Sequence, residues 1–246
     1  MIVPTIDLRP TLLPVRHQGR RPSCLAFACS TAHEHKICSG EHLCVEYLHY
    51  QAVTRTPGRN PSAGTTMFAA AAALAETGQP AEAAWPYCAL QVSPWAPPDI
   101  TSAFYRATLR PSRLHFDEVV VALDKNQPVV LGLVITDAFY RPDSQGLVAD
   151  RNPDIERGGH AVLAVGHGAF PAGSRALLIR NSWGTGWGLG GYGWLPQPYV
   201  ERQLRESAVL GPVLNYRTNV RNNRIGAPTI LNRSCVVAVG AAFSKA

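Results

Sequence analysis

Three short segments of the chain supply a thiol, an imidazole and an amide in an order that suits nucleophilic chemistry. Cys24 ends the first segment, His160 follows a Gly-Gly pair in the second, and Asn181 opens an Asn-Ser-Trp-Gly run in the third. The histidine lies roughly 130–150 residues after the cysteine, a separation known for cysteine nucleophiles. A base can deprotonate a thiol for attack on a carbonyl carbon, and an amide can orient that base. The spacing therefore predicts Cys24 as nucleophile, His160 as general base and acid, and Asn181 as the residue that orients the imidazole.

The residues around Cys24 supply two further parts of such a site. A neutral thiol is a poor nucleophile, and its pKa falls at a helix N-terminus or beside an imidazole. Ser23 is a preferred helix cap, so we expect it to cap a helix whose first turn contains Cys24. Gln18 lies six residues upstream on a Gly-containing turn. Its side-chain N–H₂ could donate to a developing oxyanion, with the backbone N–H of Cys24 as the second donor.

Each of these residues also has an ordinary structural interpretation. A buried cysteine on an Ala-rich helix is usually part of the core. A histidine beside glycines is usually a structural residue with satisfied hydrogen bonds, and an Asn-Ser-Trp-Gly run is usually a turn. The structural interpretation must hold for all three residues at once, in the correct order and separation. We therefore favour the catalytic interpretation.

The elements that would position these residues change in character along the chain. Apolar residues at helical spacing after Cys24 predict a mostly buried helix, and two further helices and a Pro-rich loop follow before the apolar strands begin. The expected helices cover 24–36, about 45–53 and about 66–76, the loop covers 85–98, and the strands cover 128–135, 161–165 and 176–179. A helical first half and a strand-rich second half indicate an α+β protein with two lobes.

Composition and charge exclude several classes of protein. The hydrophobic fraction of 46% and charged fraction of 16% are typical of a folded domain. The net charge is +6, but the basic residues are scattered and no basic block alternates with aromatic residues, so we expect no nucleic-acid partner. No uncharged apolar run is long enough for a membrane span, and the first residues do not resemble a signal peptide. We therefore expect no membrane partner, and a protein that is cytoplasmic or secreted by a leaderless route.

We expect neither a metal nor another cofactor. A His/Cys-rich patch begins at His33 and His35, but the two lie on different faces of the predicted helix and no spacing is that of zinc-ligand knuckles. We expect a solvated helix end there. The run 186–191 matches Gly-x-Gly-x-x-Gly but opens no helix. Five cysteines remain besides Cys24, and free thiols are the default expectation, with a Cys38–Cys44 bridge as an open alternative.

Several motifs beyond these residues resemble the papain-like cysteine peptidase family. The nucleophile segment, an Ala-rich helix after Gly64-Thr65, and the run Trp85-Pro86-Tyr87 are similar to family landmarks. The most specific block is 181–188 followed by Gly-Tyr-Gly at 191–193. The resemblance extends from about residue 6 to about residue 200. It implies the papain-like two-lobed fold, with a helical N-terminal lobe, an antiparallel β-barrel-like C-terminal lobe and the active-site cleft between them.

The resemblance also implies a function and a set of binding residues. The implied activity is a cysteine endopeptidase that acts through an acyl-enzyme thioester on Cys24, with Gln18 in the oxyanion hole. A peptide or protein substrate would bind in extended form, and a protein inhibitor is a further implied partner. The implied substrate-binding residues are Gly64, Thr65, Gly159 and Trp183. Gly64 would pair with the substrate backbone, and Trp183 would shield the hydrogen bond between Asn181 and His160.

The chain also departs from the family pattern. Arg21-Pro22-Ser23-Cys24-Leu25 stands where the family commonly has Cys-Gly-Ser-Cys-Trp, so one disulfide cysteine is missing. Gly159 replaces the Asp or Asn often found before the histidine. Few residues precede Pro14, so we expect an enzyme made without a long N-terminal pro-region. The low Lys and high Arg and Ala content indicates a GC-rich bacterial source.

We expect one peptidase domain over 1–213, with an N-terminal lobe mainly over 15–100. The C-terminal lobe would cover mainly 101–213 and take up the N-terminal strand. An extension over 214–246 could add an edge strand, dock on the domain or block the cleft.

Two alternatives to an endopeptidase stay open. One is a non-proteolytic thiol acyl-transfer enzyme, such as a deamidase or an effector toxin, and the other is an inactive scaffold on the same fold.

Overall fold

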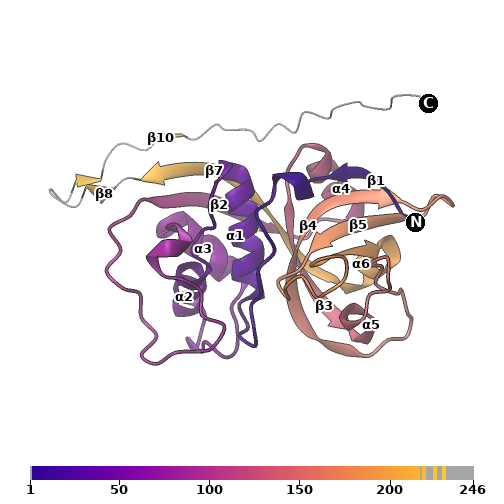
Figure 1. Ribbon diagram of the computed structural model, residues 1–246, viewed down its shortest axis with the longest axis horizontal. Helices are drawn as coiled ribbons and strands as arrows, with labels where there is room; N and C mark the ends of the chain where they lie inside the picture. Colours follow the sequence, from indigo (N-terminus) through magenta and orange to yellow (C-terminus); the bar gives the residue numbers. More distant parts are fainter. Residues whose placement is uncertain (1, 217, 220–223, 226–228, 231–246) are drawn as a thin grey trace.

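The computed structural model describes residues 2–216, 218–219, 224–225 and 229–230. After one N-terminal strand, three helices follow, and the other strands of a large antiparallel sheet come after these helices (Figure 1). The helices are α1 (Cys24–Ile37), α2 (Val45–Arg55), α3 (Met67–Glu76), α4 (Phe116–Asp124), α5 (Asp137–Tyr140) and α6 (Gln197–Gln203), with 3-10 turns η1 (Arg9–Thr11) and η2 (Glu82–Ala84). The predicted helices over 24–36, 45–53 and 66–76 are confirmed to within two residues, and the loop over 85–98 lies between η2 and the next strand.

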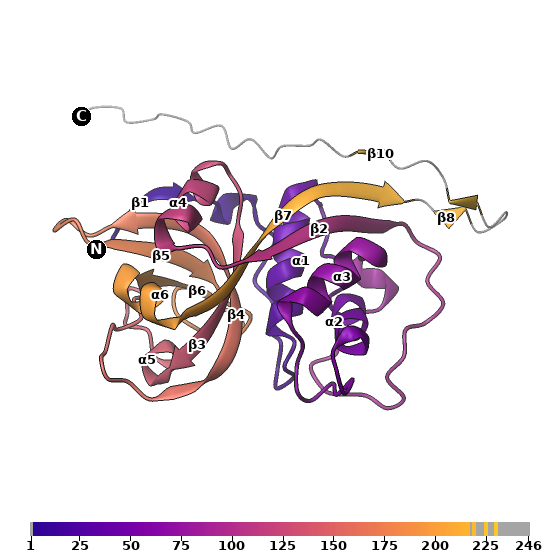
Figure 2. The ribbon, with the colours of Figure 1, turned by 180° about the vertical axis from the view of Figure 1, so that it is seen from behind.

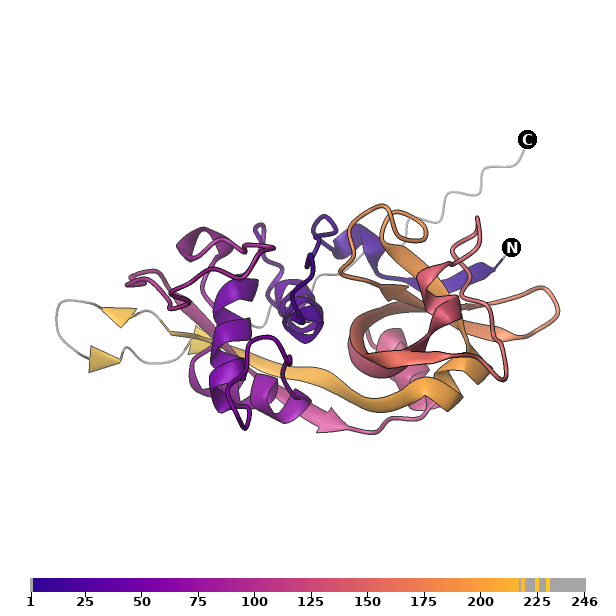
Figure 3. The ribbon, with the colours of Figure 1, turned by 90° about the horizontal axis from the view of Figure 1, so that it is seen from below.

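The sheet is antiparallel and strongly curved (Figure 3). Its main strands are β1 (Val3–Asp7), β2 (Phe104–Ser112), β3 (Val129–Thr136), β4 (Glu156–Ala169), β5 (Arg175–Arg180), β6 (Tyr192–Pro196), β7 (Leu204–Tyr216) and β10 (Thr229–Ile230), and β8 (Thr218–Asn219) pairs with β9 (Arg224–Ile225). The strand order is β10-β7-β3-β4-β5-β6, with β1 on β4 and β2 on β7. The α+β class and the antiparallel sheet are confirmed, but the described strands form an open sheet and not a closed barrel, because no pairing joins β6 to β7.

The three predicted strands lie within β3, β4 and β5, and β4 is much longer than expected. The first half of β4 pairs with β3, and its last residues pair with β5 on one edge and β1 on the other. Gly166 and Gly168 make the β1 pairing possible, because a Cβ at either position would collide with the β1 backbone. The predicted uptake of the N-terminal strand into the C-terminal lobe is therefore confirmed.

Helix α1 is buried on every side, since it lies between the other helices and the sheet (Figures 1 and 3). His33 and Glu34 have exposed fractions of 0% and 3%. The expectation of a solvated helix end at His33 and His35 is therefore wrong. The capping expectation is also wrong, because the Ser23 side chain makes no cap hydrogen bond and its Oγ instead lies 2.7 Å from the hydroxyl of Tyr87.

The boundary between the two lobes differs from the expected division. Strands β2 and β7 run side by side from the sheet lobe across the helical lobe (Figures 1 and 2). Tyr105 in β2 pairs with Gln79 after α3. Part of 101–213 therefore belongs to the helical lobe, because these strands cover the faces of α1 and α3 that the short helices cannot bury.

The start of the C-terminal extension also differs from the expected one. Strand β7 continues through Tyr216, past the expected boundary at 213, because its last residues pair with β2. Of the three roles left open for the extension, an edge strand is present at Thr229–Ile230, which pair with β7. Positions 217, 220–223, 226–228 and 231–246 of the extension lie outside the described residues.

Two further sequence expectations concern the cysteines and membrane spans. Cys24, Cys29, Cys44 and Cys88 are free thiols, so the alternative Cys38–Cys44 bridge is wrong. Cys38 is disulfide-bonded, and the default of free thiols is wrong at that residue. None of the described helices combines the length and the apolar character that a membrane crossing requires.

Candidate active site

Cys24 is the first residue of α1, and His160 stands opposite it on β4. Burial is the largest influence on the Cys24 pKa and raises it, but the hydrogen bond and the charge of His160 act in the other direction. Backbone hydrogen bonds to Ala161 and Leu25 also favour the thiolate. Together they outweigh burial and hold the pKa of the Cys24 thiol below its ordinary value. The thiol and the imidazole thus come from different lobes and meet where the lobes touch.

Asn181 fixes the orientation of the His160 ring. The Asn181 Oδ1 lies 2.8 Å from His160 Nε2 and also 2.8 Å from the backbone nitrogen of Ser182. An oxygen that accepts the Ser182 N–H is an acceptor toward the ring as well, so Nε2 carries a proton. The nitrogen left to face Cys24 is therefore Nδ1. This arrangement brings together Cys24, His160 and Asn181, as the sequence predicted.

Aromatic rings cover the imidazole and its bond to Asn181. The Trp183 ring lies 4.8 Å from the His160 ring, centroid to centroid, and the Phe139 ring lies 5.6 Å from it. Trp187 packs beneath Phe139 and donates its indole N–H to the Phe139 carbonyl oxygen. These rings exclude water from one side of the imidazole, which strengthens its hydrogen bond.

The side chain of Gln18 is held at both ends. Its Nε2 donates to the backbone oxygen of Arg21 at 2.7 Å, and its Oε1 accepts from Ser182 Oγ at 2.6 Å. An amide N–H₂ has two hydrogens, so one remains for a ligand. The Cys24 N–H is among the first four of α1, which have no partner within the helix. Gln18 and the Cys24 backbone therefore supply two donors on the nucleophile's side of the site.

Sequence reasoning missed the residues that hold Gln18 and Asn181 in place. Ser182 directly follows Asn181 in the chain, which is the one signal that could have pointed to it. Arg180 directly precedes Asn181 and donates to the carbonyl oxygens of Leu13 and Pro14, at 2.5 and 2.6 Å. It thereby ties the strand that carries Asn181 to the segment that leads to Gln18.

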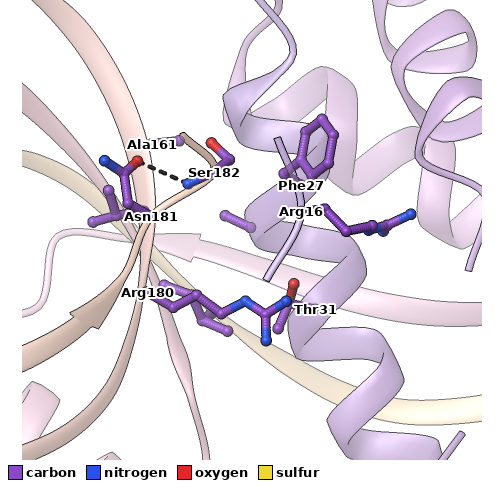
Figure 4. A pocket seen from close by; sticks show the side chains of 10 residues that line it. Arg16, Phe27, Thr31, Ala161, Arg180, Asn181 and Ser182 are labelled. Atoms are coloured by element: carbon purple, nitrogen blue, oxygen red, sulfur yellow. Dashed lines mark hydrogen bonds between the residues drawn. The ribbon is translucent and has the colours of Figure 1, made fainter. Parts of the chain in front are cut away.

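A small cavity lies directly behind this arrangement, between α1, the middle of β4 and the end of β5 (Figure 4). Its volume is about 10 Å³, close to the space that one water molecule needs. The side chains labelled around it are Arg16, Phe27, Thr31, Ala161, Arg180, Asn181 and Ser182 (Figure 4). The lobes are therefore nearly close-packed behind the catalytic residues, with two guanidinium groups at the interface.

The residues predicted to bind substrate lie around the same site. Gly64 has a φ of +82°, and a Cβ there would lie 3.4 Å from the carbonyl oxygen of Pro22, two residues before Cys24. Gly159 is exposed, and a Cβ there would meet nothing within 4 Å. The Thr65 hydroxyl lies 2.8 Å from that of Thr56 and is engaged within its own loop. Gly159 thus offers exposed backbone next to His160, whereas Gly64 is buried against Pro22.

Two observations bear on metals and on nucleotide binding. Among the described residues, no cluster of three or more His, Cys, Asp or Glu side chains is arranged to hold a metal ion. The glycine run at 186–191 forms turns and leads into β6 and not into a helix.

Comparison with known proteins agrees with this geometry. A family model described as papain family cysteine protease matches residues 2–210. The chain belongs to this family. A cysteine protease of Blomia tropicalis is 28% identical over 205 residues, which cover 78% of this chain and 58% of that protein. Cathepsin K of Mus musculus is 29% identical, over 76% of this chain and 58% of that protein. The chain therefore spans somewhat more than half the length of these relatives.

Solved structures of the papain family share the fold. Xylellain, a cysteine protease from Xylella fastidiosa, matches with a TM-score of 0.69 at 24% identity, over 85% of this chain and 86% of that one. A Carica candamarcensis cysteine protease, solved in complex with E-64, matches with a TM-score of 0.62 at 26% identity, over 85% of this chain and 98% of that one. The papain-like two-lobed fold expected from the sequence is thereby confirmed.

The structure shows what occupies the position of the missing family cysteine. The Arg21 guanidinium donates to both carboxylate oxygens of Glu46, at 2.6 and 2.7 Å, and to the backbone oxygen of Cys88. Trp95 donates its indole N–H to the same carboxylate. Arg21 is 4% exposed. A buried ion pair therefore ties the nucleophile segment to α2 in this member of the papain family.

Proposed function

We propose that this chain is a cysteine endopeptidase that hydrolyses peptide bonds through a thioester on Cys24. The observation that carries the proposal is the position of His160, which contacts Cys24 through one side of its ring and Asn181 through the other. A buried cysteine without such a partner has a raised pKa, as Cys29 does in the same helix through burial. The pKa of Cys24 is lowered instead, and this difference within α1 marks it as the nucleophile.

In the first half of the reaction, the Cys24 sulfur attacks the carbonyl carbon of the scissile bond, and the carbonyl oxygen becomes an oxyanion. The Cys24 N–H and the remaining Gln18 N–H donate to that oxyanion. His160 holds the proton taken from the thiol on Nδ1 and gives it to the leaving amine as the C–N bond breaks. The amine departs, and the acyl group stays on sulfur as a thioester.

In the second half, a water molecule takes the place of the amine. His160 removes a proton from the water while the oxygen attacks the thioester carbonyl carbon. The C–S bond then breaks, the sulfur leaves as a thiolate, and the carboxylic acid product loses its proton. Asn181 keeps the ring in one orientation through both halves, so that Nδ1 serves each proton transfer.

The geometry favours a peptide or protein substrate in extended form. Gly159 on the sheet lobe leaves exposed backbone next to His160, where a peptide backbone could approach, and Gly64 on the helical lobe is buried against Pro22. Relatives in this family have been solved with the inhibitor E-64, which makes that compound a suitable probe here. A protein inhibitor that occupies the same cleft is a further proposed partner.

The test combines E-64 labelling with cleavage of a peptide library. We expect E-64 to label the chain, Cys24→Ala to abolish both labelling and cleavage, and Cys88→Ala to keep both. Cys88 is the matched control because it is also a partly exposed free thiol. Labelling of Cys24 without cleavage of any peptide would overturn the endopeptidase and favour non-proteolytic acyl transfer. Absence of labelling would overturn the nucleophile as well and favour an inactive scaffold.

A further inference from the structure

A second depression adjoins the candidate active site on the sheet lobe. It lies at α5, at the lower edge of that lobe in Figure 1, and has a volume of about 630 Å³. Its lining residues are Asp137, Ala138, Tyr140, Arg141, Arg151 and Arg157. The Tyr140 ring lies 5.1 Å from the Trp183 ring, which in turn lies 4.8 Å from the His160 ring. We call this depression the arginine pocket. Tyr140 lines it and contacts Trp183, which in turn contacts the catalytic base His160.

The arginine pocket has an excess of positive charge. Arg157 is neutralised by Asp137, since Nη2 lies 3.0 Å from Oδ2 and Nε contacts Oδ1. Arg141 and Arg151 are exposed, and neither makes a salt bridge or side-chain hydrogen bond with any described residue. A guanidinium presents a fork of N–H groups that matches a carboxylate or phosphate. Two such forks are therefore available in the pocket.

The acidic side chains of the same segment are engaged elsewhere. Asp150 is paired with Arg202, and Glu156 lies 3.7 Å from Arg205. Asp154 accepts the backbone N–H of Ala138 with one oxygen and that of Ile155 with the other. Asp137 and Asp154 also interact electrostatically with Arg141 and Arg151, respectively, but no salt bridge among the described residues joins them, so both guanidinium groups keep N–H donors for a ligand.

The proposed reaction determines which part of a substrate reaches the pocket. The leaving amine must lie against His160, because that imidazole gives it a proton. The substrate residues that follow the scissile bond therefore leave the site past the rings that flank His160. Trp183 is partly exposed and Tyr140 is 50% exposed, so their rings form a surface for that path. Because Tyr140 also lines the arginine pocket, this path leads to that pocket.

We propose that the arginine pocket binds a carboxylate of the substrate on the leaving-group side, within a few residues of the scissile bond. The inference rests on the proposed endopeptidase function and adds a substrate class to it. The carboxylate has two possible sources, an Asp or Glu side chain or the C-terminal carboxylate of a short product segment. Both would accept N–H groups from Arg141 and Arg151, and both would make the preference depend on salt.

The test uses peptides with one constant sequence before the scissile bond. One set carries Glu, Gln or Lys at the first, second or third residue after the bond and ends in an amide. A second set carries neutral residues and ends two or three residues after the bond in either a free carboxylate or an amide. We expect kcat/KM to be about tenfold higher for the preferred carboxylate than for its neutral match, and the ratio to fall with added salt. The first set reports a side-chain source and the second a C-terminal source.

Two matched double variants distinguish an effect of the arginine pocket on the carboxylate preference from an effect of the protein's net charge. Arg141→Gln/Arg151→Gln should bring the carboxylate preference to about one and leave cleavage of the neutral peptides within about twofold. Arg110→Gln/Arg113→Gln removes the same charge from exposed arginines outside the pocket and should keep the preference. An equal loss in both double variants, or no preference in the unmodified chain, would overturn the proposal.

A separate readout keeps this proposal distinct from the proposed function. The same peptides are measured for binding to the Cys24→Ala protein, which needs no cleavage. Tighter binding of carboxylate peptides that disappears in Arg141→Gln/Arg151→Gln would support the pocket even if no peptide is cleaved. Cleavage of the neutral peptides with equal binding of charged and neutral ones would contradict the pocket and leave the peptidase in place.

Discussion

The interiors of the two lobes are built from different kinds of side chain. The helical lobe buries charged and titratable groups beside its apolar residues, among them Arg21, His33, Glu34, Glu46 and His49. The sheet lobe is filled by aliphatic side chains of β3, β4 and β5, and most of its buried polar groups, such as His160 and Asn181, lie at the active site. The helix that carries the nucleophile is thus packed among ion pairs and buried polar groups, whereas the strand that carries the base is packed mainly among apolar side chains.

This difference has consequences for what disturbs each half of the site. An ion pair contributes to stability only while both partners are present and charged. The contribution of apolar packing depends on the volume of the side chains and does not change with pH. Acid and charge-removing substitutions should therefore act mainly through the helical lobe. Substitutions that change only volume should act on the sheet lobe in the same way at every pH.

The largest effect on stability is expected from the ion pair between Arg21 and Glu46. Glu46→Gln leaves a buried guanidinium without its counter-charge, which costs about 3–5 kcal/mol in the free energy of unfolding. Urea unfolding monitored by circular dichroism measures this. Glu76→Gln is the control, because the Arg55–Glu76 pair is exposed and should cost less than about 1 kcal/mol. Equal losses in the two variants would show that the buried Arg21–Glu46 pair stabilises the helical lobe no more than an exposed ion pair does.

A second effect comes from the buried histidines of the helical lobe. Burial, the largest influence, lowers the pKa of His33 and of His49 to about 4. Between the ordinary pKa of about 6.5 and pH 4 the unfolded chain binds more protons, so stability falls as the pH drops through this window. The loss is on the order of 3 kcal/mol for each histidine.

His49→Phe tests this acid effect, because it removes one titrating ring that has no hydrogen-bond partner at either nitrogen among the described residues. The urea midpoint should fall less steeply with decreasing pH between pH 6.5 and 4 than in the unmodified chain, while His33 and His35, whose pKa values burial also lowers, still titrate. An unchanged slope would show that burial of His49 does not contribute to the acid sensitivity.

A smaller effect, on catalysis, is expected from Ser182, whose hydrogen bond to Gln18 crosses the boundary between the lobes. Ser182→Ala removes the hydrogen bond that holds Gln18 Oε1 from the sheet-lobe side. We expect kcat to fall about tenfold with KM almost unchanged, less than the roughly 10²–10³-fold loss from removing an oxyanion donor by Gln18→Ala. Steady-state kinetics with one peptide measures both. A loss as large for Ser182→Ala as for Gln18→Ala would mean that the serine acts on the oxyanion itself.

The smallest effect is expected inside the sheet lobe. Ile179 is fully buried on β5. Ile179→Val removes one methylene group and should cost about 1 kcal/mol, by the same amount at pH 7 and at pH 4.5. A cost that changes with pH would show that titrating groups also support the sheet lobe.

The sequence was most informative where local pattern and chemistry coincide. The start of α1 at Cys24, the strand that carries His160 and the site motif at Asn181 were predictable because periodicity and spacing act along the chain. The burial of His33 was not, because helical periodicity does not show that β2 and β7 cover α1 from a distance. The sequence also did not reveal the Arg21–Glu46 pair, since an arginine in a loop is usually solvated and its partner lies 25 positions away.

The pKa of the Cys24 thiol is the most direct test of whether His160 on the sheet lobe activates Cys24 on the helical lobe. It is measured from the pH dependence of alkylation by iodoacetamide, in the unmodified chain and in His160→Ala, with Cys88→Ala as background in both to remove a second partly exposed thiol. We expect a pKa below the ordinary thiol value in the first protein. His160→Ala removes the hydrogen bond and the charge that lower the Cys24 pKa. Burial, which raises this pKa, remains, so the pKa of Cys24 should rise above the ordinary thiol value. The same alkylation profile in both proteins would contradict a site in which His160 activates Cys24.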